Sequence, residues 1–145
     1  MAIAFDPNNI LHGNDTEVWF AGEQLFDVTS IEAKINVDTE TVEVLGNPGS
    51  FSRFNGYAGE GTLKKYKTNS KYLSLISDEI KTGVIPDVTI ITSVKQPATG
   101  KVERIALKYV SFSEATLINL EKKALAEEEI PFNFGDFELL EVIDS

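Results

Sequence analysis

Few residues in this chain could act as catalytic groups or metal ligands, and their spacing forms no recognisable catalytic or metal site. His12 is the only histidine among 145 residues, and there is no cysteine. A Ser-His-Asp relay needs a histidine held beside its partners, and a zinc site needs several histidine or cysteine ligands. His12 instead lies in a polar, turn-rich N-terminal segment, residues 1–15. The sequence therefore predicts neither a hydrolase nor a zinc enzyme.

Two further patterns could suggest a ligand, but neither has the spacing that a ligand site needs. Glu127, Glu128 and Glu129 are consecutive, but neighbours on a strand point to opposite faces, so we interpret them as a solvated acidic edge. The glycines of Gly56-x-x-Gly59-x-Gly61 precede strand-like residues, whereas a phosphate loop leads into a helix with a Lys-Ser or Lys-Thr pair. Nothing singles out a carboxylate pair for glycosidase-type catalysis. We predict no enzyme, no cofactor and no metal.

Composition and charge narrow the class of protein further. The chain is 42% hydrophobic and 25% charged, which is typical of one globular domain spanning residues 1–145. Thirteen basic against twenty-three acidic residues give a net charge of −10, which opposes binding to nucleic-acid phosphates. No apolar run is long enough for a membrane span and no signal peptide is visible. We expect a soluble product that is cytoplasmic when made.

The elements that would position any site are mostly strands. Residues 29–38 alternate cleanly, with Ile31, Ala33, Ile35 and Val37 on one face. A shift of the apolar phase within residues 102–112 predicts a bulge near Tyr109. Residues 119–129 have high helix propensity but lead into an alternating run, and we interpret them as extended. The other predicted strands are residues 17–20, 56–67, 88–94 and 137–143, the last after a turn at 135–136, and we expect residues 1–9 to be disordered.

One helix is predicted, over residues 69–82. Leu73, Ile76 and Ile80 recur at helical spacing, and Gly83 with Pro86 ends the pattern. We expect these three apolar residues to anchor the helix to a sheet.

Residues 39–55 have the most unusual composition. They combine turn-forming residues, including Gly46 and Pro48, with apolar residues that follow no steady period. Long irregular loops are uncommon in compact domains unless they have a task. The apolar groups either fold back onto their own domain or are buried on another chain.

Several separated stretches resemble the tail tube protein family of contractile-tailed phages, including defective prophages and phage-tail-like bacteriocins. They are Val44-Leu45-Gly46, Gly56-Tyr57-x-Gly59-x-Gly61-Thr62-Leu63, Tyr66-Lys67, the helix-like NSKYLSLISDEIKTG and the ending EEEIPFNFGDFELLE. The resemblance implies a mainly β fold with one α-helix, an antiparallel β-sandwich or open barrel of about eight strands. Asn47-Pro48 and Arg53-Phe54-Asn55 depart from the pattern of the relatives.

The resemblance also implies a function. Six copies would form a ring, and rings would stack into a tube inside a sheath, as a conduit for DNA, or for ions in a headless bacteriocin. The implied partners are further copies of the chain, the sheath, the tape-measure protein and the baseplate, in a virion tail assembled in the host cytoplasm. Residues 39–55 would reach the neighbouring ring, and Glu32 and Asp38 are candidates for acidic groups facing the lumen. The predicted inter-subunit contacts are Val42, Glu43, Val44, Leu45, Gly46, Phe51, Arg53 and Phe54.

Two other functions remain open at this point. One is a type VI secretion-like or baseplate tube component of similar fold. The other, from a different class, is a monomeric ligand-binding β-sandwich, either an enzyme or a carbohydrate-binding module, whose loop forms a groove. Rings or tubes in electron micrographs would favour assembly, whereas strict monomers would favour a binding module.

Overall fold

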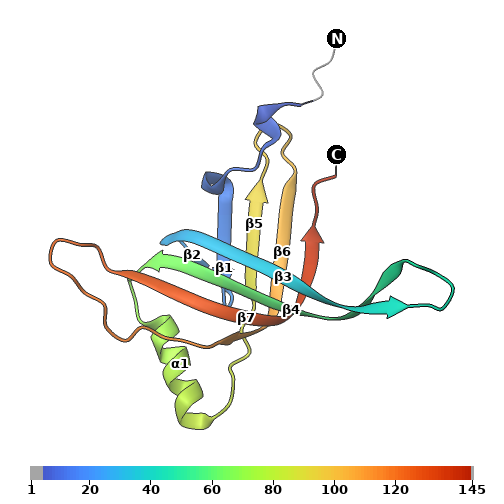
Figure 1. The fold of residues 1–145 in the computed structure, drawn as a ribbon. Helices are drawn as coiled ribbons and strands as arrows, with labels where there is room; N and C mark the ends of the chain where they lie inside the picture. Colours follow the sequence, from blue (N-terminus) through green and yellow to red (C-terminus); the bar gives the residue numbers. More distant parts are fainter. Residues whose placement is uncertain (1–4, 145) are drawn as a thin grey trace.

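The strands form one curved antiparallel sheet that folds back on itself, with a single helix below one end (Figure 1). The computed structural model describes residues 5–144. Within them the order of the seven strands is β2-β1-β5-β6-β7-β4-β3. The elements are η1 (Pro7–Asn9), η2 (Gly13–Asp15), β1 (Thr16–Phe20), β2 (Glu23–Leu25), β3 (Val28–Glu43), β4 (Ser50–Tyr66), α1 (Lys71–Thr82), β5 (Ile90–Lys95), β6 (Val102–Phe112) and β7 (Glu127–Glu141). This confirms a mainly β, antiparallel fold with one helix, and the sheet is open.

β7 is the strand that joins the two layers of the folded sheet. Its first part, Glu127 to Phe134, pairs with β4, and its last part, Phe132 to Glu141, pairs with β6. In Figure 1, β3, β4 and β7 cross over β1, β5 and β6. The predicted turn at 135–136 is therefore wrong, because β7 runs through it and bends into the second layer. The core lies between the layers, and its largest fully buried side chains are those of Leu63, Val88, Ile90, Val110, Ile130 and Phe132.

Gly59 and Gly61 leave room for two aromatic rings of the core. Gly59 pairs with Phe134 and Gly61 with Phe132 across the β4–β7 ladder. A Cβ on Gly59 would lie 2.3 Å from the Phe134 ring, and one on Gly61 would lie 2.6 Å from the Phe132 ring. The rings thus cover the glycines, an arrangement that stabilises glycine within a strand. At Gly61 the backbone carbonyl of Glu32 also occupies the space that a Cβ would need.

Tyr109 accounts for the phase shift in β6, but not through a bulge. Lys108 pairs with Asp136 and Val110 with Phe134, so the register is the same on both sides of Tyr109. The backbone at Tyr109 has a φ of 55°, in the left-handed region. Its side chain consequently turns to solvent, while Leu107 and Val110 both face the core. The bulge predicted near Tyr109 is wrong, since the register shift in this ladder lies between Arg104 and Ile105.

Two segments outside the sheet, residues 113–126 and the N-terminal residues, differ from the structure that the sequence predicted. Residues 113–126 form no strand and no helix, so the extended interpretation of 119–129 is wrong except for its last three residues, which begin β7. Disorder is predicted for residues 1–9, of which residues 1–4 lie outside the described part. Residues 7–9 form η1, and the Gln96 side chain donates a 2.7 Å hydrogen bond from Nε2 to the Asn9 carbonyl. This bond ties the N-terminal segment to the β5–β6 turn.

Helix α1 agrees with its predicted range to within two residues, but its predicted buried face is only partly correct. It begins after Ser70 and ends at Gly83, whose φ of 71° suits a left-handed C-cap. Tyr72 and Ile76 are buried, whereas Ile80 is 77% exposed. Ile80 is exposed because the last turns of α1 project beyond the sheet that covers its first turns (Figure 1). Ile80 is therefore not an anchor.

Shortening Ile76 to alanine should destabilise the subunit by about 2–4 kcal/mol, because a buried isoleucine would leave a cavity between α1 and the sheet. Ile80→Ala is the matched control on the same helix, and it should change the unfolding free energy by less than about 0.5 kcal/mol because its side chain is exposed. Urea unfolding measures both variants. Equal losses would show that the helix is held by a different face.

Candidate functional site

A two-stranded ribbon projects from the sheet, and it is formed by the outer ends of β3 and β4 (Figure 1). Pairing of β4 with β7 stops at Gly59, while pairing with β3 continues to Glu43 opposite Ser50. Only residues 44–49 are a turn, in which Gly46 has a φ of 82°. Most of residues 39–55 therefore form paired antiparallel strands, and they are not the irregular loop that the sequence predicted. A register shift between Asp38 and Thr39 leaves Asn55 unpaired and disguises the alternation in the sequence.

The ribbon buries none of its apolar side chains in its own subunit. Every residue from 39 to 55 is exposed, and Leu45 at the tip is 101% exposed. Val42 pairs directly with Phe51, and Glu40 pairs with Arg53, so these four side chains share one face. Phe54, paired with Thr39, lies on the other face. The first of the two alternatives for these apolar groups, folding back onto their own domain, is therefore wrong.

The structure brings the predicted contact residues together at one end of the molecule. Val42, Glu43, Phe51, Arg53 and Phe54 lie on the two strands of the ribbon, and Val44, Leu45 and Gly46 lie in its turn. Glu32 and Asp38 lie on β3 nearer the sheet and are exposed, and Asp38 accepts a 2.8 Å hydrogen bond from the Asn55 amide. Whether these residues meet another subunit or a lumen stays a prediction.

The outer edge of β3 is open to further pairing. Within residues 5–144, β3 lies at one end of the strand order and pairs only with β4. β3 is sixteen residues long, and a long uncovered edge presents a row of free backbone donors and acceptors. Such an edge is suited to a neighbouring subunit.

A buried cluster of charged residues, which the sequence pattern did not predict, joins β4, β7 and the connection between β2 and β3. Lys65 on β4 lies 3.4 Å from Asp27 and 3.7 Å from Glu128, measured from Nζ to the carboxylate oxygens. Lys67 lies 3.0 Å from the other oxygen of Glu128. Lys65 and Glu128 are only 4% and 3% exposed. The predicted acidic edge at 127–129 is therefore wrong for Glu128, whose even spacing from Ile130, Phe132 and Phe134 is the signal that could have placed it on the buried face.

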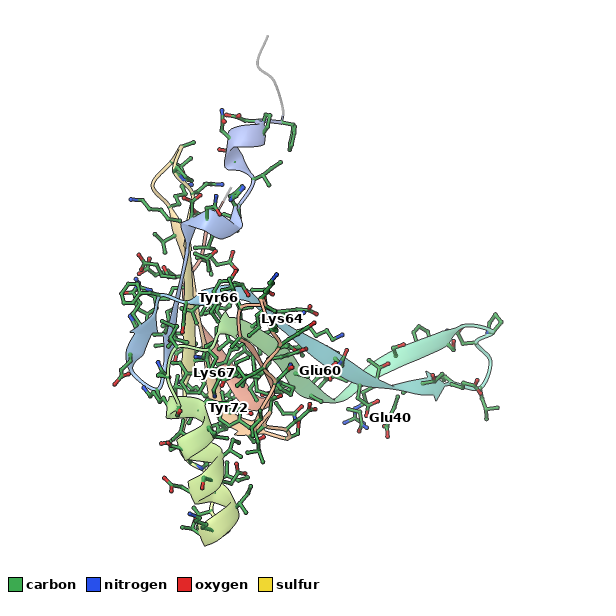
Figure 2. The ribbon with its side chains drawn as sticks, turned by 90° about the vertical axis from the view of Figure 1, so that its left-hand side faces the viewer. Glu40, Glu60, Lys64, Tyr66, Lys67 and Tyr72 are labelled. Atoms are coloured by element: carbon green, nitrogen blue, oxygen red, sulfur yellow. The ribbon has the colours of Figure 1, made fainter. Side chains whose placement is uncertain are left out.

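Figure 2 shows Lys67 and Tyr72 close to where the end of β4 meets the start of α1. The Tyr72 hydroxyl donates a hydrogen bond to the Glu114 carbonyl and so links α1 to residues 113–126. Burial raises the pKa of Tyr72 to about 12, and the nearby charges of Glu128, Glu114 and Glu79 contribute to this rise in pKa. The tyrosine therefore acts as a neutral hydrogen-bond donor at physiological pH.

Stability should fall between about pH 10 and 12, because the unfolded chain releases the Tyr72 proton near pH 10 while the folded chain retains it. Below pH 10 the two states bind this proton equally, so the contribution is then fully present. Replacing Tyr72 with Phe should make the unfolding free energy fall less steeply across this range. Tyr109→Phe, at an exposed ring, is the control. Denaturant unfolding at several pH values measures the slopes, and equal slopes for native and Tyr72→Phe proteins would contradict the assignment.

The described residues give little support for a site that binds a metal ion or a small molecule. Residues 5–144 contain no cluster of three or more metal-ligating side chains. No helix in this part of the chain is both long and apolar enough to cross a membrane. A hollow of about 480 Å³ on the concave face is lined mainly by apolar residues, among them Ile31, Ile35, Ile105, Leu107 and Leu139. These residues offer a ligand few polar groups that would orient it.

Comparison with known proteins places this arrangement in a family. The chain is 29% identical over 141 residues to the phage-like element PBSX protein XkdM of Bacillus subtilis (strain 168), covering 96% of each chain. Its fold matches a chain in the structure of the anti-feeding prophage cap, the tube-terminating cap, with a TM-score of 0.74 and 17% identity, over 98% of this chain and 95% of the other. It also matches a chain of the sheath-tube complex of the PVC extracellular contractile injection system, with a TM-score of 0.73 and 16% identity, over 92% and 93% of the two chains.

The family model described as phage tail tube protein (DUF2001) matches residues 3–141, nearly the whole length of this chain. Its match covers the open antiparallel sheet, the helix and the projecting ribbon alike. The chain therefore belongs to the phage tail tube protein family.

Proposed function

We propose that this chain forms the inner tube of a phage tail or tail-like particle, by assembling into six-fold rings that stack. The observation that carries the proposal is the ribbon, whose apolar residues are all exposed in the single subunit. At about 3.3 Å per residue, residues 51–58 extend about 25 Å beyond the paired sheet, far enough to reach across another subunit. The open edge of β3 offers a second contact surface, for neighbours within a ring.

The proposed role is structural, without enzymatic activity. The described residues form no cluster of three or more side chains that could hold a metal ion, and Lys65 and Glu128 of the charged cluster are buried by the fold. A sheath, a tape-measure protein and a baseplate are the proposed partners, and the virion tail is the proposed location, with assembly in the host cytoplasm. Support for a sheath comes from the matched chain in a sheath-tube complex. A tube component of a baseplate or of a type VI-like system would use the same contacts.

Electron microscopy of the purified protein tests the proposal. We expect rings or tubes with a central hole at micromolar concentration, and sedimentation of the assembled fraction in an ultracentrifuge. A protein that remains strictly monomeric over a wide range of concentration and salt would overturn the proposal. It would favour a monomeric ligand-binding β-sandwich, with the hollow on the concave face as the binding site.

DNA should pass such a tube without binding to it. Six copies at −10 each carry about −60 formal charges per ring, and acidic side chains on the channel wall, with Glu32 and Asp38 as candidates, would repel phosphates. We expect no retardation of duplex DNA in a mobility-shift assay at low salt, where phosphate binding is strongest. Retardation at micromolar protein would contradict the passive conduit.

A further inference from the structure

Tyr57 lies at the base of the ribbon, at the point where β4 leaves the rest of the sheet. The last pair of the β4–β7 ladder joins Gly59 to Phe134, whereas the β3–β4 ladder continues along the ribbon. Tyr57 is two residues beyond that last pair, so its side chain is on the same face of β4 as Gly59 and the buried Leu63. In Figure 1 the ribbon leaves the sheet close to the place where β7 turns into the second layer.

The Tyr57 side chain joins the base of the ribbon to the bend of β7. Its hydroxyl donates a 3.0 Å hydrogen bond to the Gly135 carbonyl and lies 3.5 Å from a carboxylate oxygen of Asp136. Its ring packs edge-on against the Phe137 ring, with 6.4 Å between the ring centroids. Gly135 directly follows Phe134, so the hydroxyl bonds to the first residue of β7 past the β4–β7 ladder. The side chain therefore connects the two strands where their backbones no longer pair.

The β7 side of this contact is held by the second layer of the sheet. Asp136 pairs with Lys108 in the β6–β7 ladder. A Cβ on Gly135 would lie 3.3 Å from the Tyr109 Cβ, so the backbone at the bend of β7 packs closely on β6. The Tyr57 hydroxyl is therefore bonded to a carbonyl that belongs to the second layer and not to the ribbon.

Beyond Tyr57, the ribbon consists of its own two strands. The register shift between Asp38 and Thr39 leaves Asn55 unpaired, and such an irregularity bends the strand that carries it. Every residue from 39 to 55 is exposed, so burial against the rest of the described chain contributes little to holding them in place. A pair of strands outside a larger sheet is only marginally stable and twists more than strands within one. The direction of the ribbon is therefore set at its base.

We propose that Tyr57 is a positioning residue for assembly, which holds the ribbon in the direction in which it meets a second copy. This inference rests on the proposed function, and it names the residue that orients the ribbon. A ribbon that is held before contact loses little conformational freedom on binding, whereas a swinging ribbon points in a competent direction for only part of the time. The hydroxyl and the ring contribute separately, through Gly135 and Phe137. Tyr57 acts through the ribbon, without touching the second copy.

Time-resolved fluorescence energy transfer measures the direction of the ribbon in single subunits, at nanomolar concentration. The chain has no cysteine of its own, so Thr41→Cys on the ribbon and Lys95→Cys at the end of β5 provide two exposed labelling positions. The labelled subunit with Tyr57 intact should give a narrow spread of donor–acceptor distances. Tyr57→Phe, which removes only the hydroxyl, should widen this spread. Tyr57→Ala should widen it further, because the contact with Phe137 is then lost as well.

The protein concentration needed for assembly is the second measurement, made on the unlabelled chain. Tyr57→Phe should raise it about fivefold, which corresponds to about 1 kcal/mol, the usual net contribution of one hydrogen bond. The thermal midpoint should stay near that of the native protein, because Tyr57 is 41% exposed. Tyr66→Phe is the matched control, since Tyr66 is 39% exposed but lies on the opposite face of β4, at the end far from the ribbon. It should change neither the spread of distances nor the assembly concentration.

The outcomes separate this inference from the proposed function. An unchanged spread of distances in both Tyr57 variants would overturn the inference, and so would a wider spread with an unchanged assembly concentration; the tube function stands in both cases. Equal effects of Tyr57→Phe and Tyr66→Phe, or a Tyr57→Phe subunit that no longer folds, would show a general loss of structure and would also overturn it. If the native protein forms no rings or tubes, the proposed function fails and the role of Tyr57 in assembly fails with it. The spread of distances still decides in that case whether Tyr57 orients the ribbon.

Discussion

A subunit in which residues 39–55 are replaced by a two-residue Gly-Ser turn should fold normally and fail to form tubes. Asp38 and Gly56 are direct partners in the β3–β4 ladder, and a two-residue loop can close a hairpin between them. The removed residues are all exposed, so the core of the subunit is unaffected. The thermal midpoint should therefore stay near that of the native protein.

The loss of assembly follows from the apolar area that the ribbon can bury on a neighbour. At about 25 cal/mol per Å², burying Phe51 with the aliphatic side chains would contribute several kcal/mol per contact, less the cost of ordering. Each subunit in a stack would lose this contribution. Sedimentation and electron microscopy measure the assembled fraction.

A matched control keeps the ribbon and alters one polar side chain on its other face. Thr41→Ser alters an exposed side chain that pairs with Ser52, on the face opposite Val42 and Phe51, and it should assemble normally. Tubes of normal yield from the deletion would show that the ribbon is not needed for stacking. A deletion variant that is itself unfolded would show that the ribbon supports the subunit and not the assembly.

Glu128→Gln should destabilise the subunit by about 3 kcal/mol, the largest effect that we expect from a nearly isosteric change. Glu128 and Lys65 are 3% and 4% exposed, and removing one charge of a buried pair leaves the other without compensation. Lys65 keeps Asp27 at 3.4 Å, which limits the loss. Lys67, which is 29% exposed, can recover contact with water. Urea unfolding measures the free energy.

Glu129→Gln is the matched control, because it makes the same chemical change one residue along, at an exposed position. It should alter the unfolding free energy by less than about 0.5 kcal/mol. Replacing both buried charges, as Lys65→Met/Glu128→Leu, should recover most of the stability, since apolar residues of similar volume replace a buried pair at little cost. Equal effects of Glu128→Gln and Glu129→Gln would contradict the burial of the pair.

The sequence by itself determined the features that depend on local periodicity. Alternation identified β3 between Ile31 and Val37, and helical spacing with Gly83 as a stop identified α1 within two residues of its ends. Both signals arise from neighbours along the chain, so they need no knowledge of the rest of the fold. A single histidine and the lack of cysteine likewise argue against a hydrolase or a zinc site on composition alone.

The tertiary structure decided which surfaces those elements bury and which they leave free. Ile80 has the spacing of a core residue but lies on a turn of α1 that extends past the sheet, and Glu128 lies in an acidic run but faces Lys65 in the interior. The ribbon differs again, because a single unpaired residue, Asn55, shifts the register and hides the period of two. Burial and pairing depend on segments distant in sequence, and no local pattern records where those segments lie.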